Sequence, residues 1–230
     1  MANTARKKPG SVNMDNEGLQ TLERLQLSYE KNKKRINTVL IVVLALIVGF
    51  FGYQRLYKAP RETKAASAIY HAQRYFDMDS VSKALNGDGQ HAGFLKVIRN
   101  YGGTKAANLS HYYAGLCYLK MGDYKNAVKY LESFNGKGTL LTTIAAGALG
   151  DAYMESGNVS KGIDAYRKAS ADKDDVLLTP LYLFRLGLAC EMNNKPEDAK
   201  KAYKRIRDEY PMSAEAREID KYLARLGELE

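Results

Sequence analysis

Apolar residues follow two different patterns along this chain. From Val39 to Phe51 the sequence VLIVVLALIVGFF contains no polar side chain. The longer stretch from Ile36 to Tyr53 contains no charged side chain and is also compatible with a membrane span. Eighteen helical residues that rise about 1.5 Å each span about 27 Å, close to the ~30 Å hydrocarbon core of a bilayer. This run therefore predicts a transmembrane helix over residues 36–54.

A cleaved signal peptide or a buried core helix can also contain a long apolar run. A cleaved signal peptide needs a short basic segment before the run and small residues before the cut. Here 35 residues precede the run, and the residues 53–57 after it, YQRLY, contain no small-residue cleavage site. A buried core helix would normally alternate with polar positions. The sequence favours an uncleaved signal anchor.

Basic residues flank the predicted span unequally. By the positive-inside rule, the more basic side faces the cytoplasm. The flanking residues are Lys31, Lys33, Lys34 and Arg35 before the span, and Arg55 and Lys58 after it. Counting fifteen residues on each side narrows the margin to five basic residues against four. We expect a cytoplasmic N-terminus and a C-terminal domain in the periplasm.

Residues 1–35 form the predicted cytoplasmic tail. Its first eighteen residues are polar and show no periodicity, as in a mobile tail. Apolar residues then recur at steps of three and four, which predicts a short amphipathic helix before the span. These residues are Leu19, Leu22, Leu25 and Tyr29. Such a helix either rests on the lipid surface or docks on a cytoplasmic partner.

Beyond the span the apolar period is helical, and three segments align with one another. We take Gly115, Gly150 and Gly187 as the origin of each segment. Small or apolar and aromatic residues recur at fixed distances from these origins. Three positions later they are Tyr118, Tyr153 and Cys190; twelve later, Ala127, Gly162 and Ala199; sixteen later, Leu131, Tyr166 and Tyr203; nineteen later, Phe134, Ala169 and Ile206.

This spacing resembles the tetratricopeptide repeat, a helical hairpin with a period of 34 residues. The resemblance implies repeats over about 108–141, 143–176 and 180–213, with Pro211 ending the last hairpin and a C-terminal capping helix. A glycine on one helix that faces a small residue on its partner lets the two backbones approach. The predicted fold is all-α: one transmembrane helix, then an α-solenoid of three to four hairpins.

Residues 55–106 are predicted to form a linker and a degenerate N-terminal hairpin. The sequence FLKVIRNYGGTKAANL aligns with YKRIRDEYPMSAEARE at an offset of 109 residues. The first helix of this hairpin, around Ala65 to Phe76, has no glycine origin, and the glycine-rich loop LNGDGQHAG follows it. This unit departs from the repeat pattern and suits a cap.

Charge and composition exclude several classes of function. The net charge of +9 divides into +4 for residues 1–35 and +5 spread over the rest, so no concentrated phosphate-binding surface is predicted, and we expect no nucleic-acid partner. The cysteines lie 73 residues apart, and neither they nor the three histidines show metal-ligand spacing. No catalytic or phosphate-binding motif occurs. We expect a non-enzyme with no metal and no cofactor.

Function is therefore expected from a surface. In tetratricopeptide repeats the first helix of each hairpin lines a concave groove, and the resemblance places nine residues there. They are Tyr112, Leu116, Leu119, Asp151, Met154, Glu155, Phe184, Leu188 and Glu191. This apolar set with three acids suits an extended or helical segment that carries positive charge. Some of the apolar members are also suited to packing between helices.

The whole layout is similar to the YfgM family of ancillary subunits of the SecYEG translocon. The resemblance implies an adaptor in the bacterial inner membrane that works beside a PpiD-like membrane chaperone and handles exported client polypeptides. A scaffold for envelope assembly or cell division is the alternative.

Overall fold

The computed structural model describes residues 16–228, and within them not the side chains of residues 16–20, 22 and 25. The described elements are helices, and the one β feature among them is an isolated bridge between Gly87 and Ala92. The chain divides into two compact units, residues 1–58 and 59–230. The elements of the first unit are α1 (Asn16–Gly52) and the π-helix η1 (Tyr53–Lys58). Those of the second are α2 (Ala59–Asp77), α3 (Val81–Asn86), α4 (Phe94–Asn100), α5 (Lys105–Lys120), α6 (Tyr124–Ser133), α7 (Leu140–Glu155), α8 (Val159–Ala169), α9 (Leu178–Met192), α10 (Pro196–Glu209), η2 (Glu215–Glu218) and α11 (Ile219–Arg225).

In the first unit, α1 contains both the predicted amphipathic segment and the predicted span. The helix already begins at Asn16, so residues 16–18 belong to it rather than to the tail. Residues 1–15, the rest of the stretch without periodicity, lie outside the described residues. By length and composition, the described part of the chain has one helix able to cross a membrane, with an 18-residue window of mean hydropathy 2.4 and no buried residues.

Residues 55–77, the first part of the region where the sequence predicts a linker and then a helix around Ala65 to Phe76, are helical. The π-helix η1 follows α1 directly and leads into α2, whose second residue is Pro60. A proline has no N–H for the carbonyl four residues earlier, and its ring crowds that carbonyl. This accounts for the departure from α geometry just before Pro60. Helical structure therefore continues through residues 55–64, ahead of the predicted first helix, although these residues carry no strong apolar period.

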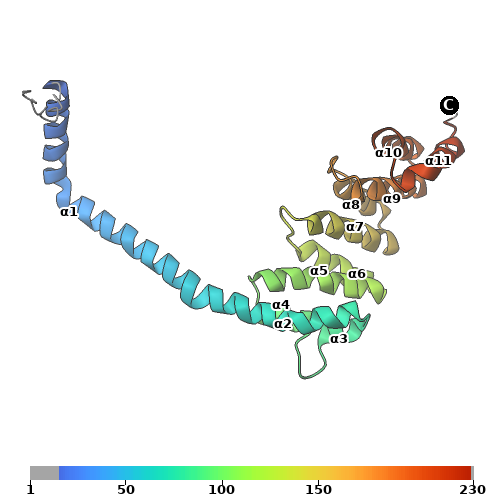
Figure 1. The fold of residues 1–230 in the computed structure, drawn as a ribbon, viewed down its shortest axis with the longest axis horizontal. Coiled ribbons are helices and arrows are strands. Elements are labelled where there is room, and N and C mark those ends of the chain that lie inside the picture. Colours follow the sequence, from blue (N-terminus) through green and yellow to red (C-terminus); the bar gives the residue numbers. More distant parts are fainter. Residues whose placement is uncertain (1–15, 229–230) are drawn as a thin grey trace, which may run out of the picture. The chain divides into compact units, whose positions relative to one another are not determined.

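In the second unit, α5–α6, α7–α8 and α9–α10 form three antiparallel hairpins, which stack one on the next (Figure 1). We call α5, α7 and α9 the first helices and α6, α8 and α10 the second helices. Buried residues of successive hairpins form a continuous series of apolar clusters. At the C-terminal end, η2 and α11 pack on the last hairpin and bury Ile219 and Leu223. The all-α solenoid is confirmed.

The origin glycines make room for the residue sixteen positions later. A Cβ at Gly187 would lie 2.2 Å from the ring of Tyr203, and one at Gly150 would lie 2.5 Å from the ring of Tyr166. At Gly115 the side chain of Leu131 takes the same place. The small residue twelve positions later is therefore not the main neighbour of the origin, although the Gly150 carbonyl lies 3.5 Å from a Cβ at Gly162. The glycine admits a large side chain at each helix crossing.

Gly187→Ala is expected to destabilise the last repeat by about 2 kcal/mol, because overpacking a core costs about 1–3 kcal/mol. Tyr203 is fully buried and its hydroxyl is hydrogen-bonded, so its ring has little freedom to move. Gly162→Ala is the matched control: its new Cβ meets the flexible end of Met154, and alanine gains up to about 1 kcal/mol in a helix. Chemical unfolding followed by circular dichroism compares the two. Equal effects would contradict the role of the ring contact.

The N-terminal hairpin has small residues at its helix crossing, as the other hairpins do, but its second helix is interrupted by an insertion. At an offset of 43 residues, Ala72, Tyr75 and Ala84 match Gly115, Tyr118 and Ala127; from Phe94 on, the offset is 37. The second helix thus carries six extra residues, which end α3 and form the loop before α4 (Figure 1). Ala72 and Ala84 are both fully buried, as the crossing requires. As expected, this unit has no glycine origin, and Ala72 takes that position.

The inserted loop is ordered by its own polar groups. The Asp88 carboxylate accepts hydrogen bonds from the backbone N–H groups of Gln90 and His91 and, at 2.6 Å, from the Tyr75 hydroxyl. These hydrogen bonds hold the pKa of Asp88 well below its usual range, the Tyr75 bond contributing most. His91 also stacks on His71, with ring centroids 3.6 Å apart. The loop therefore closes over the first helix of its own hairpin.

Candidate functional site

Four of the nine predicted groove residues line one pocket. This pocket, of about 480 Å³, opens across the first helices α5, α7 and α9, and we call it the groove pocket. Its lining residues are Leu119, Tyr124, Asp151, Met154, Glu155, Tyr166 and Arg185. The offsets place the predicted members at the C-terminal ends of α5 and α7, next to the turns into the second helices. The stacking of hairpins therefore brings residues of three repeats to one site.

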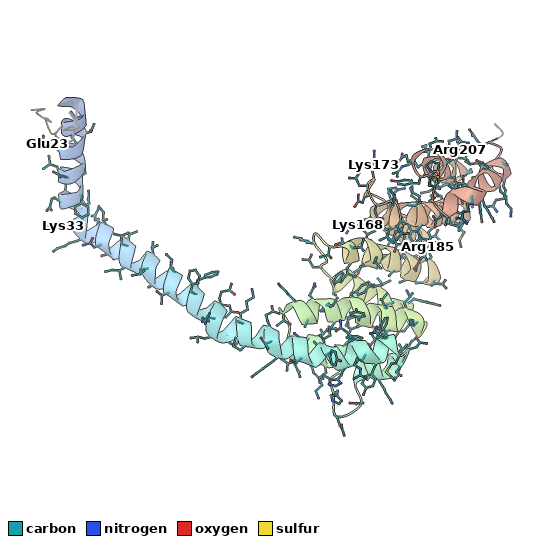
Figure 2. The ribbon with its side chains drawn as sticks, in the orientation of Figure 1. Glu23, Lys33, Lys168, Lys173, Arg185 and Arg207 are labelled. Atoms are coloured by element: carbon teal, nitrogen blue, oxygen red, sulfur yellow. The ribbon has the colours of Figure 1, made fainter. Side chains whose placement is uncertain are left out.

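An ion pair crosses the floor of the groove pocket. Arg185, which Figure 2 labels, reaches from α9 to Asp151 of α7, at 2.5 Å and 2.6 Å to the two carboxylate oxygens. The Tyr166 hydroxyl donates to the same carboxylate at 2.7 Å. Burial of Arg185 alone would lower its pKa, but the bond to Asp151 raises it. Burial and the bond to Asp151 both raise the pKa of Tyr166. Asp151 therefore links two repeats.

Glu155 gives the groove pocket its available charge. Its side chain is exposed at the end of α7, and no ion pair to it is found among the described residues. Leu119 and Met154 beside it are half-buried apolar side chains. Because Arg185 already neutralises Asp151, the pocket has one carboxylate left for a ligand. This arrangement suits a cationic group flanked by apolar side chains.

Phe184 lies in a second pocket, of about 490 Å³, between α9 and the C-terminal helices. Its ring packs edge-to-face on Tyr222, with centroids 4.9 Å apart. The other lining residues are Leu181, Ala214, Glu215, Arg217 and Glu218. This C-terminal pocket is also partly apolar, and its two carboxylates outnumber its one arginine. The prediction did not include its α11 and η2 side chains, because the sequence pattern assigned them only to a cap.

Three predicted groove residues have structural roles instead. Tyr112 is 7% exposed and packs in the core against Phe134, so its assignment to an open groove is wrong. Burial raises its pKa to about 12. The Glu191 carboxylate accepts a hydrogen bond of 2.6 Å from the Tyr203 hydroxyl. It also forms an ion pair of 2.8 Å with Arg225. Leu116 is half-buried against the same core as Tyr112.

Leu188 is half-buried, one residue after its origin glycine, and lines neither pocket. Sequence reasoning did not place Tyr124, Tyr166 or Arg185 in the groove. The available signal for Arg185 was its place as a lone arginine two residues before an origin glycine. Its helix is mostly apolar and has no acid in its first turn. Tyr124 begins a second helix, and the pattern gave no reason to place it beside the first ones.

Both cysteines are buried outside these two pockets. Cys117 and Cys190 are free and fully buried. Burial raises the pKa of Cys117 to about 12 and raises that of Cys190 as well. Between residues 16 and 228, no three histidine, cysteine or acidic side chains are grouped to hold a metal ion.

Comparison with known families agrees with this geometry. A tetratricopeptide-repeat model matches residues 147–214, and a second one matches residues 110–137. The chain contains tetratricopeptide repeats. Such repeats indicate an adaptor for protein–protein interaction. Neither match reaches the N-terminal hairpin with its inserted loop, and a comparison with curated proteins finds no match.

Proposed function

We propose that this tetratricopeptide-repeat protein is a membrane-anchored adaptor that holds a partner segment in its groove pocket and catalyses no reaction. The supporting observation is the convergence of Leu119, Met154 and Glu155 from two repeats on one open pocket. The Asp151–Arg185 pair stiffens its floor and leaves the Glu155 carboxylate available. A cation beside an aliphatic or aromatic side chain is the chemistry that fits this pocket.

The anchor and the location form the second part of the proposal. Residues 36–54 span the inner membrane as a signal anchor, Lys33, Lys34, Arg35 and Arg55 lie at its ends, and the repeats lie in the periplasm. The resemblance to the YfgM family supports a place beside the SecYEG translocon and a PpiD-like chaperone. In this setting the groove pocket receives exported polypeptides or a partner subunit. The excess of basic residues before the span supports the orientation.

A peptide tests the chemistry of the groove pocket. The chain has no tryptophan, so the fluorescence of a tryptophan peptide is observed without background. We expect acetyl-Leu-Trp-Lys-Leu-Arg-amide to bind the full chain in detergent with a blue-shifted emission. Glu155→Lys should weaken binding about tenfold, the size expected for a lost charge-assisted contact. Asp77→Lys, the same charge change at an exposed site on α2, should leave binding unchanged. Equal losses for both variants would refute the pocket assignment.

A further inference from the structure

Two equivalent crevices open between successive second helices, on residues that the groove pocket does not use. One lies between α6 and α8 and the other between α8 and α10, each with a volume of about 370 Å³. Ala146, Leu149 and Ala165 line the first, and the residues 37 positions later, Leu183, Leu186 and Ala202, line the second. The floors are therefore alike. The crevices differ in what stands above them.

In the crevice between α6 and α8, the protein supplies its own ring and acid. Tyr153 is 8% exposed and its hydroxyl donates to Glu132 of α6. The ammonium of Lys161 lies 5.2 Å from the centre of the Tyr153 ring. Glu132 lines this crevice, and its carboxylate holds the Tyr153 ring beside it.

In the crevice between α8 and α10, both parts are replaced. Cys190 stands where the first crevice has Tyr153, and Arg167 stands where it has Glu132. Cys190 of α9 lines the cavity directly. Asp198 and Lys201 of α10 line it too. The ring and its acid are missing together, and a cation stands where the acid was. The cavity therefore reaches Cys190, whereas the first crevice does not reach Tyr153.

The rim of this crevice is basic. Four cations and one acid line it: Arg167, Lys173, Lys201, Arg205 and Asp198. Lys173 belongs to the loop between α8 and α9, whose position Figure 2 marks. Three of the cations pair with carboxylates of their own helices, Arg167 with Asp164 at 2.8 Å, Lys201 with Asp198 at 3.5 Å and Arg205 with Glu209 at 3.0 Å. Such exposed pairs contribute little and exchange readily.

We propose that the crevice between α8 and α10 is a second docking site, for a protein segment that carries an aromatic side chain next to a carboxylate. The ring enters the space above Cys190 and Leu186, and the carboxylate binds Arg167 and Lys173. The neighbouring crevice shows the complementary arrangement inside this protein, with Tyr153 as the ring and Glu132 as the acid. The site lies between the second helices α8 and α10, over residues of α9 that do not line the groove pocket, and takes an acidic segment, so it does not depend on the basic segment proposed for that pocket.

The experiment compares two tryptophan peptides on the full chain in detergent. Acetyl-Ser-Glu-Trp with a free carboxylate should bind with a blue-shifted emission, and its affinity should fall as salt rises. Acetyl-Ser-Gln-Trp-amide should bind at least about tenfold more weakly, because its charges are removed. Cys190→Tyr with Arg167→Glu recreates the pair of the first crevice and should abolish binding of the acidic peptide. Unchanged binding by this double variant would overturn the proposal.

Matched variants separate docking from folding. Arg167→Glu with Lys173→Glu changes only exposed side chains and should also abolish binding, whereas Lys168→Glu, at the first crevice, should not. The melting curves of these two charge variants should match that of the unchanged chain. None should alter binding of the basic peptide, and Glu155→Lys should leave the acidic peptide unaffected. Equal affinity for the acidic and the neutral peptide would also overturn the proposal.

Discussion

Replacing Tyr203 by alanine is expected to destabilise the C-terminal repeat by about 3–5 kcal/mol, the usual cost of deleting a large buried ring. Tyr203 is fully buried, fills the space over Gly187 and packs beside Phe184 and Tyr222. Each repeat contacts only its neighbours, so the loss should appear first as early unfolding of α9 and α10. Denaturant unfolding followed by circular dichroism, with hydrogen exchange to locate the change, measures it.

Tyr203→Phe is the matched control, because it keeps the ring and removes only the hydroxyl. Glu191 loses the Tyr203 hydrogen bond but keeps its ion pair with Arg225. We expect a cost of about 1 kcal/mol for this bond. If the alanine and phenylalanine variants were equally stable, the ring would not be the element that holds the repeat together.

Val43→Lys is expected to reduce insertion of the anchor by about 2.5–3.5 kcal/mol, the cost of a lysine at the centre of a membrane helix. Val43 lies in the middle of the apolar run and is exposed along α1. The substituted chain should therefore become extractable from membranes by alkaline carbonate. Val43→Leu preserves the apolar surface and should remain in the membrane fraction. Full resistance of the lysine variant to extraction would argue against a span at this position.

The repeats were predictable because close helix crossings impose a residue type. Where two helices meet over a large side chain, only glycine or alanine fits, so the origins recur at nearly constant distance. Gly187 and Tyr203 were both identified from spacing alone. Their mutual contact was not, because spacing shows which positions matter but not which pairs face each other. In the N-terminal hairpin, alanine satisfies the same requirement, and the six-residue insertion hides the register.

The groove was predictable only in part, because position on a first helix does not fix exposure. Tyr112 and Phe184 both lie three residues before an origin, yet Tyr112 is buried and Phe184 lines a pocket. At the same position in the middle repeat stands Gly147, and the ring of Tyr182 from the next repeat fills its space. Contacts between repeats thus decide which members of a repeating position reach the surface.

The measurement that tests the central claim most directly is photocrosslinking in living cells from a single introduced residue in the groove pocket. A photoreactive amino acid at Met154 should give discrete crosslinked protein bands, and Glu155→Lys should remove them. The same probe at Lys161, an exposed residue of α8 outside the pocket, serves as the control. Translocon subunits, a membrane chaperone or exported chains among the products would support the proposed setting. Identical products from Met154 and Lys161, or none from Met154, would contradict a protein-binding groove at this site.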